Sequence, residues 1–442
     1  METIKLKLKT PLWTGDIDTR SDIVRASGFM GSLRWWTEAL MLGLEKTFVC
    51  DPVSDGRCPE KMEQQKKEIY FYCPGCLLFG ATGWQRAFKI RLAGGKSVFN
   101  GPPINIVPRG RTNGWRLGSG LWGEIDLSVI PYKAYFDPVL IMLPLLVATR
   151  WGCLGARTQH GYGVTDIIGQ AELKVEATAF FNQLTALKTM LPSGFKIREE
   201  ANSFAMPNLK EMFFTKIRLS TGNNWWEEVD GIRERGKRDQ NDYYRGWSED
   251  LRMNNWIESG SVPIAPAVKN WLRYGGGKVL WEKGDQNFEQ NVANWLFGST
   301  KTLCPSCYGT VREDNRNARN YFCGYCRKSF PKEKSINKNA AKVNVSCAYP
   351  VNNGQWEFRI WGWLPPEDGR FEIKTMFLNE LKASLEGRGK APFPFGQLFG
   401  DKASKGGLSV WREFGSPRDT VSPDNKDYLN YLDSLSEGEE GC

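Results

Sequence analysis

The triplet Leu-Phe-Gly occurs three times, and two of its copies extend into nearly the same pentapeptide. Residues 78–82 read Leu-Phe-Gly-Ala-Thr, residues 296–300 read Leu-Phe-Gly-Ser-Thr, and the third triplet lies at 398–400. The upstream segments 3–10 and 215–221 also correspond, since both alternate apolar with basic or polar residues. Self-similarity of this kind is typical of a duplicated structural unit. The sequence therefore predicts one module written twice.

Hydrophobic periodicity predicts the same order of elements in both modules. A strand, a helix, two strands, a second helix and a last strand follow one another, which is the ferredoxin-like arrangement. In the first module these segments are 3–9, 30–44, 87–92, 123–130, 138–151 and part of 163–175. In the second module they are 216–220, 265–274, 342–348, 356–363, 371–385 and 408–414. The sequence thus predicts the α+β class, with two ferredoxin-like modules in tandem.

These patterns also predict the domain boundaries. The first module is expected to span residues 1–177, followed by a connecting segment, 178–208, that contains a helical stretch. The second module is expected at 209–415, with a cysteine-rich insertion at about 301–332. Residues 416–442 hold seven acidic and two basic side chains, and we expect a mobile acidic tail there, with a helical pattern near 428–435.

The charge of the chain is unevenly distributed. The 442 residues carry a formal charge of +9, and because the tail contributes −5, the first 415 residues carry +14. A basic body favours an anionic partner such as nucleic acid. A solvated charged surface without such a partner would have the same composition, so charge alone leaves both interpretations open.

Neither a secretory signal nor a membrane-spanning segment is visible. The most apolar stretch, 139–148, has about half the length needed to cross a bilayer, and it is better interpreted as a buried helix. We therefore expect a cytoplasmic protein with reduced thiols. Its eleven cysteines are then metal-ligand candidates before they are disulfides.

One set of four cysteines has the spacing of a zinc ribbon. Two Cys-x2-Cys knuckles are separated by 15 residues, and each knuckle places two thiolates on one tight turn. Four thiolates can close a tetrahedron around Zn²⁺ and leave no open coordination position, so the site is expected to be structural. The four residues are Cys304, Cys307, Cys323 and Cys326.

A second set of cysteines is less regular. Cys73 and Cys76 form another knuckle, and Cys50 and Cys58 precede it at uneven spacing. Most of this set lies in polar or loop-like sequence, where a buried free cysteine is less expected. A second structural zinc and a set of unliganded cysteines both remain open.

The glycine-rich stretch 152–163 is the most ligand-like part of the chain. Its four glycines allow positive φ and a close approach of the backbone, and successive N–H groups can form an anion-binding nest. Arg157 would donate to phosphate, Tyr162 would offer a stacking face, and Thr158 and His160 are further candidate contacts. A tight loop that needs glycine for its geometry alone is the alternative.

Two further segments combine glycine, arginine and tryptophan. Residues 31–36 open a predicted helix, whose N-terminus attracts phosphate. The loop 108–116 has the composition of a single-stranded nucleic-acid contact, or of a solvated hairpin tip. The candidate contacts in and near these segments are Arg20, Arg25, Ser32, Arg34, Trp35, Arg109, Arg111 and Arg116.

Catalytic signatures are sparse. His160 is the only histidine, so chemistry that needs a pair of histidines is excluded. A lone histidine can act as a general base, but more often it is a hydrogen-bonding loop residue. No nucleophile elbow, carboxylate pair or aspartate-rich metal site stands out, and the sequence argues mildly against an enzyme.

Four motifs resemble those of a known family. They are Pro-Leu-Trp-Thr-Gly at 11–15, Gly-Ser-Leu-Arg-Trp-Trp at 31–36, Cys-Pro-Gly-Cys-Leu-Leu-Phe-Gly-Ala-Thr-Gly-Trp at 73–84 and Gly-Ala-Arg-Thr-Gln-His-Gly-Tyr-Gly at 155–163. Together they resemble the RAMP superfamily of CRISPR-associated proteins and, within it, the family of first subunits of the Cmr (type III-B) effector complex. The resemblance is specific over about 3–164, and the ribbon at 304–326 lies outside it.

The resemblance implies a fold and a function. It implies two ferredoxin-like RAMP modules, assembly with other Cmr subunits in antiviral defence, and binding of CRISPR RNA or target single-stranded RNA near the 3′ end of the guide. Target cleavage in this family belongs to another subunit, so Arg34, Trp35, Arg157 and His160 would contact RNA without forming a catalytic centre. Two alternatives remain: a metal-independent endoribonuclease that processes CRISPR RNA, with His160 as its base, and a mainly structural subunit that docks on its neighbours.

Overall fold

The computed structural model describes residues 2–15, 21–50, 57–64, 67–97, 103–169, 174–190, 206–232, 251–282, 286–336, 339–351, 354–365 and 373–437. It mixes helices with antiparallel sheets, in agreement with the predicted combination of elements. Within this described part, none of the helices has the length and apolar character that crossing a bilayer requires.

The first sheet is built around β1 (Glu2–Leu12), which pairs antiparallel with a neighbour on each side. The strand order is β4-β7-β1-β8, where β4 is Phe88–Ser97, β7 is Leu121–Pro131 and β8 is Thr165–Ile168. Successive side chains of a strand point to opposite faces. Leu6 and Leu8 are therefore buried, whereas Lys5 and Lys7 are exposed on the outer face. The alternation in the sequence thus decides which face of the sheet the helices cover.

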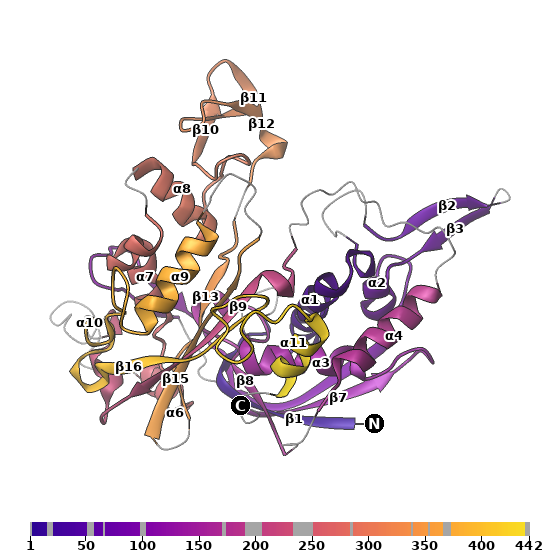
Figure 1. Ribbon diagram of the computed structural model, residues 1–442, viewed down its shortest axis with the longest axis horizontal. Helices are drawn as coiled ribbons and strands as arrows, with labels where there is room; N and C mark the ends of the chain where they lie inside the picture. Colours follow the sequence, from indigo (N-terminus) through magenta and orange to yellow (C-terminus); the bar gives the residue numbers. More distant parts are fainter. Residues whose placement is uncertain are drawn as a thin grey trace.

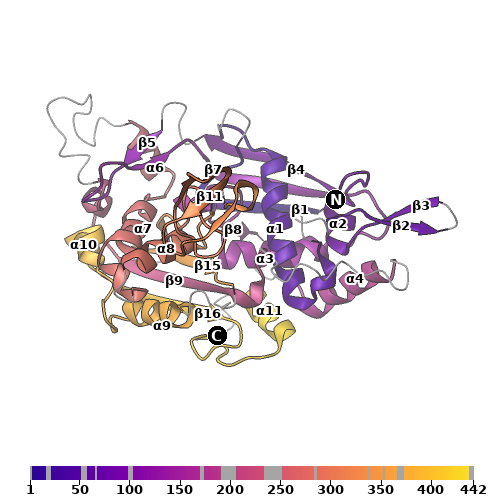
Figure 2. The same cartoon turned by 90° about the horizontal axis from the view of Figure 1, so that it is seen from above.

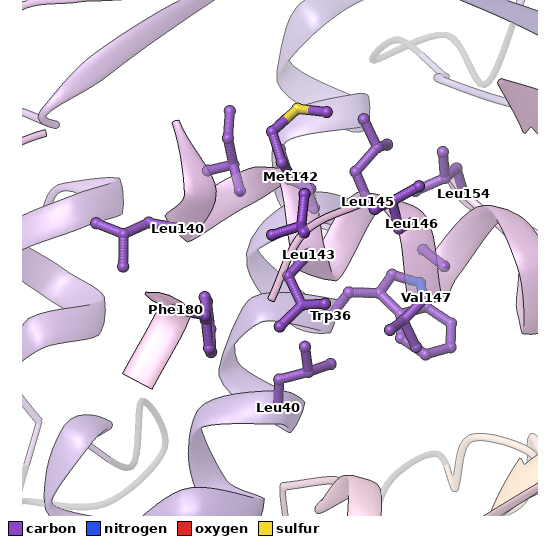
Figure 3. Packing of buried hydrophobic residues seen from close by; sticks show 14 of the residues in the cluster. Trp36, Leu40, Leu140, Met142, Leu143, Leu145, Leu146, Val147, Leu154 and Phe180 are labelled. Atoms are coloured by element: carbon purple, nitrogen blue, oxygen red, sulfur yellow. The ribbon is translucent and has the colours of Figure 1, made fainter. Parts of the chain in front are cut away.

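Helices α1 (Ala26–Leu44), α3 (Val139–Trp151) and α4 (Ala177–Thr189) contribute to the apolar core of the first sheet. Figure 3 shows Trp36 and Leu40 of α1 beside the leucines of α3, with Phe180 of α4 at the same core. Helix α4 lies within the predicted connecting segment 178–208, and its Phe180, Leu184 and Leu187 are buried in this core. The first core therefore extends beyond residue 177.

The second sheet repeats the strand order of the first. It runs β13-β15-β9-β16, with the short β14 (Tyr349–Pro350) also paired to β15. The strands are Val343–Val345 (β13), Gln355–Trp363 (β15), Met212–Ser220 (β9) and Lys405–Glu413 (β16). Its apolar core includes residues of α7 (Ala265–Tyr274), α8 (Gln286–Phe297) and α9 (Lys374–Leu385). Figure 2 shows the two sheets with their helices side by side.

Smaller elements decorate these two layers. The three-stranded sheet β10-β11-β12 (Val311–Asp314, Asn317–Cys323 and Ser329–Pro331) projects away from them in Figure 1. Two hairpins are β2–β3 (Glu60–Gln64, Lys67–Phe71) and β5–β6 (Ile104–Ile106, Trp115–Leu117). The short α-helices are α2 (Pro74–Phe79), α6 (Leu251–Glu258) and α10 (Phe395–Phe399). The 3₁₀ turns are η1 (Lys46–Phe48), η2 (Thr158–His160), η3 (Leu209–Glu211), η4 (Trp225–Glu228), η6 (Gly276–Leu280), η7 (Lys332–Lys334) and η9 (Asp401–Ala403).

The C-terminal segment differs from the mobile tail expected at 416–442. Residues 416–437 are ordered, and helix α11 (Tyr428–Glu437) packs on the first core, although it follows the second sheet in the chain. Trp151 of α3 donates its Nε1–H to the Leu435 carbonyl at 2.8 Å, and the Tyr428 hydroxyl donates to the Leu40 carbonyl at 3.2 Å. The acidic composition predicted mobility, but apolar residues at helical spacing outweigh it. Residues 438–442 lie outside the described residues.

Candidate functional site

The predicted ribbon cysteines come together as a four-thiol cluster. Their sulfur atoms lie within 4.8 Å of one another, and the Sγ–Sγ distances are 3.7 Å for Cys304–Cys326 and 3.5 Å for Cys307–Cys323. A tetrahedron with metal–sulfur bonds of about 2.3 Å has edges of about 3.8 Å. All four residues are free cysteines, so this donor set fits a metal ion.

The less regular cysteines also converge. Cys50, Cys58, Cys73 and Cys76 form a second cluster within 4.8 Å, and the sulfurs of Cys50 and Cys76 are 3.6 Å apart. Backbone amides donate to the sulfurs, as from Cys73 to Cys58 at 3.2 Å and from Cys76 to Cys73 at 3.4 Å. The structure therefore brings all four cysteines close enough together to serve one metal ion.

Arg34 of α1 lies beside this cluster. Its guanidinium donates to the Glu38 carboxylate at 2.6 Å, to the Gly80 carbonyl at 3.1 Å and to the Cys76 sulfur at 3.6 Å. Arg34 was predicted as an RNA contact, but in the structure its donors are used within the protein. The side chain instead joins the cysteine cluster to the first Leu-Phe-Gly motif.

The second module repeats this contact. Arg273 of α7 donates to the carbonyl of Gly298 at 2.5 Å, that of Phe297 at 3.2 Å and the side chain of Asn294 at 3.2 Å. Arg34 and Arg273 thus hold the glycines of the first and second Leu-Phe-Gly motifs, and each motif adjoins a cysteine cluster. Sequence reasoning missed Arg273, although its place on the helix that precedes the motif was a usable signal.

The glycine-rich loop 152–163 is held at its start by both modules. Arg359 of β15 donates through Nη1 to the carbonyls of Thr149 and Gly152, both at 2.8 Å, at the C-terminal end of α3. Trp36 of α1 donates to the Cys153 carbonyl at 2.9 Å. A buried guanidinium on the last carbonyls of a helix fixes where the helix stops. The loop therefore leaves α3 in a defined direction.

The later part of the loop lies against the second module. The Cys347 amide donates to the Gly161 carbonyl at 3.0 Å, and the Lys269 amine of α7 donates to the Gln159 carbonyl at 2.7 Å. Gly161 has φ +96°, and a Cβ there would lie 2.5 Å from the Cys347 nitrogen. Glycine is thus required at position 161 by a close contact between the modules. This agrees with the interpretation that the loop needs glycine for its geometry. The exposed side of the loop is still available for a ligand.

Arg157 is the loop residue placed to meet a ligand. It adopts a left-handed conformation with φ 57°, and its guanidinium lies 3.6 Å from the centre of the Trp13 ring. The side chain is half-buried, and burial lowers the pKa of its guanidinium, which still remains charged at neutral pH. This contact with the Trp13 ring holds the guanidinium in place.

Three other predicted loop contacts differ in their exposure. Tyr162 is fully buried, donates its hydroxyl to the Gly118 carbonyl at 2.6 Å and packs edge-on against Trp13 and Trp256. It offers no face to a base, so the predicted stacking role is wrong. Thr158 and His160 begin and end the turn η2 and are both partly exposed.

His160 is poorly suited to acid–base work. Its Nδ1 is buried and has no hydrogen-bond partner among the described residues. Burial, and then the nearby Lys269 and Arg157, lower the pKa of His160 to about 4. The imidazole is therefore neutral at pH 7, and the cations around it suit an anion better than proton transfer.

The loop 108–116 is not a free hairpin tip. The Arg109 amide donates to Asp230 at 2.9 Å, and Asn270 donates to the Arg109 carbonyl at 3.4 Å. The Arg111 guanidinium lies 4.0 Å from the centre of the Tyr274 ring. Arg116 is exposed on β6. This loop of the first module is docked on helix α7 of the second.

Helix α1 begins at Ala26, so residues 31–36 lie inside the helix and the helix N-terminus expected there is wrong. Arg25 precedes the helix and lies 3.8 Å from Asp22, and its amide donates to the Thr14 hydroxyl at 3.0 Å. Ser32 is half-buried, and the half-buried Trp35 packs edge-on against Trp361. Arg20 lies outside the described residues.

Lys269 carries a testable pH dependence. Burial, and then Arg273, lower its pKa from 10.5 to about 7. Between these two values the unfolded chain holds a proton that the folded protein has released, so the free energy of unfolding rises with pH. We expect the stability of the wild type relative to Lys269→Met to rise by at most about 1.4 kcal/mol per pH unit above pH 7.

Urea unfolding near pH 7 and near pH 9 measures this difference, with the exposed Lys7→Met as the control. A difference that stays constant or falls between the two pH values would show that Lys269 remains charged in the folded protein.

Comparison with known proteins gives a family match over part of the chain. Residues 5–166 match the model of the RAMP superfamily, so the resemblance is confirmed over this part of the chain. No curated protein matches the sequence. Among solved structures, the apo crystal structure of Cmr1 from Pyrococcus furiosus is 15% identical, with a TM-score of 0.31 over 84% of this chain and 91% of that one.

Two cryo-EM structures of the Type III-B Cmr-beta complex also match. The one bound to cognate target RNA and AMPPnP in the presence of ssDNA is 11% identical, with a TM-score of 0.37. The one bound to cognate target RNA alone is 11% identical, with a TM-score of 0.34. In both, the alignment covers 85% of this chain and 97% of the other.

Proposed function

We propose that this chain, whose residues 5–166 match the RAMP superfamily, is a non-catalytic RNA-binding subunit of a type III-B (Cmr) CRISPR effector complex. In this proposal it consists of two tandem ferredoxin-like modules and contacts CRISPR RNA or target RNA near the 3′ end of the guide. Other Cmr subunits would be its protein partners. The strand order shared by the two sheets supports the tandem arrangement.

The observation that carries the RNA-binding proposal is Arg157 stacked on Trp13. An arginine held at the rim of a glycine-rich loop presents a planar fork of donors to a phosphate or to a base edge. The buried Lys269 of α7 holds the same loop by donating to the Gln159 carbonyl. An arginine beside a tryptophan suits the backbone and bases of single-stranded RNA.

The two cysteine clusters are proposed as structural zinc sites. All-thiolate, four-ligand clusters with these sulfur spacings are typical of Zn²⁺ and leave no position for a reacting water. A bound ion would cross-link the chain segments that carry the four cysteines of each cluster. Arg34, which donates to Cys76, would offset part of the negative charge of the first thiolate set.

The endoribonuclease alternative has little support in the geometry. His160 is the only imidazole, its Nδ1 is buried, and its low pKa reflects burial next to two cations. Proton transfer needs a group within reach of the substrate and a pKa near the working pH. The lone histidine meets the second requirement poorly, and we propose that it positions the loop.

Replacing Arg157 with alanine tests the proposal. We expect about a tenfold loss of affinity for single-stranded RNA, because one charge-assisted phosphate contact is removed. The slope of log affinity against log salt should fall by about one. Fluorescence anisotropy with a labelled oligouridine measures both quantities, and Arg91→Ala, on the outer face of the first sheet, is the charge-matched control.

A CRISPR repeat RNA, incubated with the protein in EDTA, should stay intact. Unchanged affinity in Arg157→Ala would remove the loop from the RNA interface. A site-specific product that disappears in His160→Ala would instead establish the nuclease alternative.

A further inference from the structure

The cysteine ribbon stands apart from both sheets. Residues 301–336 fold into the three-stranded sheet β10-β11-β12 around their four-thiol cluster, and Figure 1 shows this sheet projecting from the body next to α8. Its aromatic residues Tyr321, Phe322 and Phe330 are half-buried, and none of them belongs to either large hydrophobic core. Within the described residues, these three rings add to neither large core, and a metal ion bound by the four cysteines would hold this sheet together.

The ribbon is strongly basic. Residues 301–336 carry eight lysine or arginine side chains and three acidic ones, a formal excess of five in a chain whose total is +9. Four thiolates with one divalent ion would lower this excess by two, to +3. Two of the acids are engaged locally: Glu313 pairs with Lys332, and Asp314 accepts from the Ser329 hydroxyl at 2.5 Å. The charge left at the surface is positive.

Cations and aromatic rings are interleaved on this sheet. Arg312 of β10 is paired with Phe322 of β11, and its guanidinium lies 5.5 Å from the ring centre. The Lys332 amine lies 5.2 Å from the ring centre of Tyr321, whose side chain is on the opposite face because neighbouring residues of a strand alternate. A ring with a cation beside it can stack a base while the cation meets the adjacent phosphate.

The second knuckle continues this pattern next to the cysteine cluster. Tyr325 is 42% exposed, which places it among the few large aromatic side chains of the described surface with that exposure. Arg327 and Lys328 follow it directly and are exposed, and Arg319 is exposed on β11. Charge complementarity therefore favours a polyanion with unpaired bases over an acidic protein surface, which would leave the aromatic rings without stacking partners.

We propose that the ribbon is a second binding arm for single-stranded RNA, separate from the glycine-rich loop. The ribbon can have this role only if the proposed function holds, because that function makes RNA the ligand of the whole protein. A short RNA would occupy the loop alone, whereas a longer RNA would reach the ribbon as well and gain affinity from it.

The test compares RNAs of two lengths on one variant. The variant carries Arg319→Ala, Arg327→Asn and Lys328→Ala, where asparagine suits the left-handed φ of 54° at position 327. The control carries Lys5→Ala, Lys7→Ala and Arg91→Ala, which removes the same charge from exposed positions on the first sheet. The probes are oligouridines of about 6 and about 30 nucleotides, shorter and longer than the typical footprint of one single-strand site.

We expect the ribbon variant to lose about tenfold to a hundredfold affinity for the long probe and to bind the short probe as the wild type does. Its salt slope for the long probe should fall by about two to three. The control should bind both probes nearly normally. UV crosslinks of the long probe should map to Tyr325 or Phe322, and an unchanged metal content would show that the ribbon is folded.

Three outcomes would overturn the inference. An equal loss in the control would mean that only net charge matters. Unchanged affinity for the long probe would exclude the ribbon from RNA binding. If the ribbon variant instead failed to bind neighbouring Cmr subunits, the ribbon would be a protein-docking surface. If the wild type bound neither probe, the proposed function itself would fail, which is a different result from a ribbon variant that matches the wild type.

Discussion

Asp419→Ala should destabilise the protein by about 3–5 kcal/mol, because it leaves a fully buried arginine without its counter-charge. Arg412 and Asp419 are both inaccessible to solvent, and the guanidinium Nε lies 3.0 Å from the carboxylate Oδ2. The same carboxylate accepts from the backbone amides of Glu413, Val421 and Ser422 at 2.8–2.9 Å. Removing it therefore leaves one buried charge and three backbone donors without their acceptor.

The destabilisation caused by Asp419→Ala should be greatest in the C-terminal segment, residues 416–437. Arg412 also donates to the Ser434 hydroxyl at 2.6 Å, so the ion pair ties β16 to helix α11. Urea unfolding followed by fluorescence measures the stability, and limited proteolysis shows whether residues 416–437 come loose first. The exposed pair Lys174–Glu437 provides the control: Glu437→Ala should leave the unfolding midpoint near that of the wild type. A midpoint for Asp419→Ala as high as that of the control would contradict the importance of the buried pair.

Serine substitutions in the two cysteine clusters should have unequal consequences. Cys76→Ser and Cys326→Ser should each reduce the metal content from two ions per chain to one, because three thiolates and a hydroxyl make a poor zinc site. Cys76→Ser should also lower the melting temperature of the body by several degrees or more. Its cluster is buried against the first module, and Arg34 joins it to Gly80.

Cys326→Ser should unfold the ribbon and leave the main melting transition near that of the wild type, since β10–β12 form a separate sheet. Mass-spectrometric metal analysis and calorimetry of the purified variants give both quantities. Two ions retained in either variant would mean that the corresponding cluster is not a four-thiolate site. Equal shifts of the main transition would mean that the ribbon is as integral as the first cluster.

Local periodicity predicted the elements well where one face is buried throughout. The helix at 265–274 agrees with α7 as observed, because Val268, Trp271 and Leu272 are spaced for one helical face. The strand predicted at 408–414 begins earlier, at Lys405, since Gly406 and Gly407 obscure the alternation. The mixed helix and strand class and the meeting of the ribbon cysteines follow from spacing alone.

The roles of single side chains depended on contacts that are distant in the sequence. Tyr162 looks exposed among glycines, but Trp256, which comes from a later helix, covers its ring. The partner of Arg34 one helical turn on, Glu38, was visible in the sequence, whereas its contact with Cys76 required the fold. Lys269 and Arg359 reach the glycine-rich loop from the second module, and no local pattern marks them.

The return of helix α11 to the first core has a consequence for synthesis on the ribosome. Tyr428, Tyr431, Leu432 and Leu435 complete an apolar surface whose other side is made by α1 and α3. During synthesis this apolar surface of α1 and α3 therefore stays uncovered until residues 428–435 have been translated. Chains that expose apolar surface for this long depend on chaperones or fast elongation. A truncation that removes α11 should therefore lower the soluble yield of the protein.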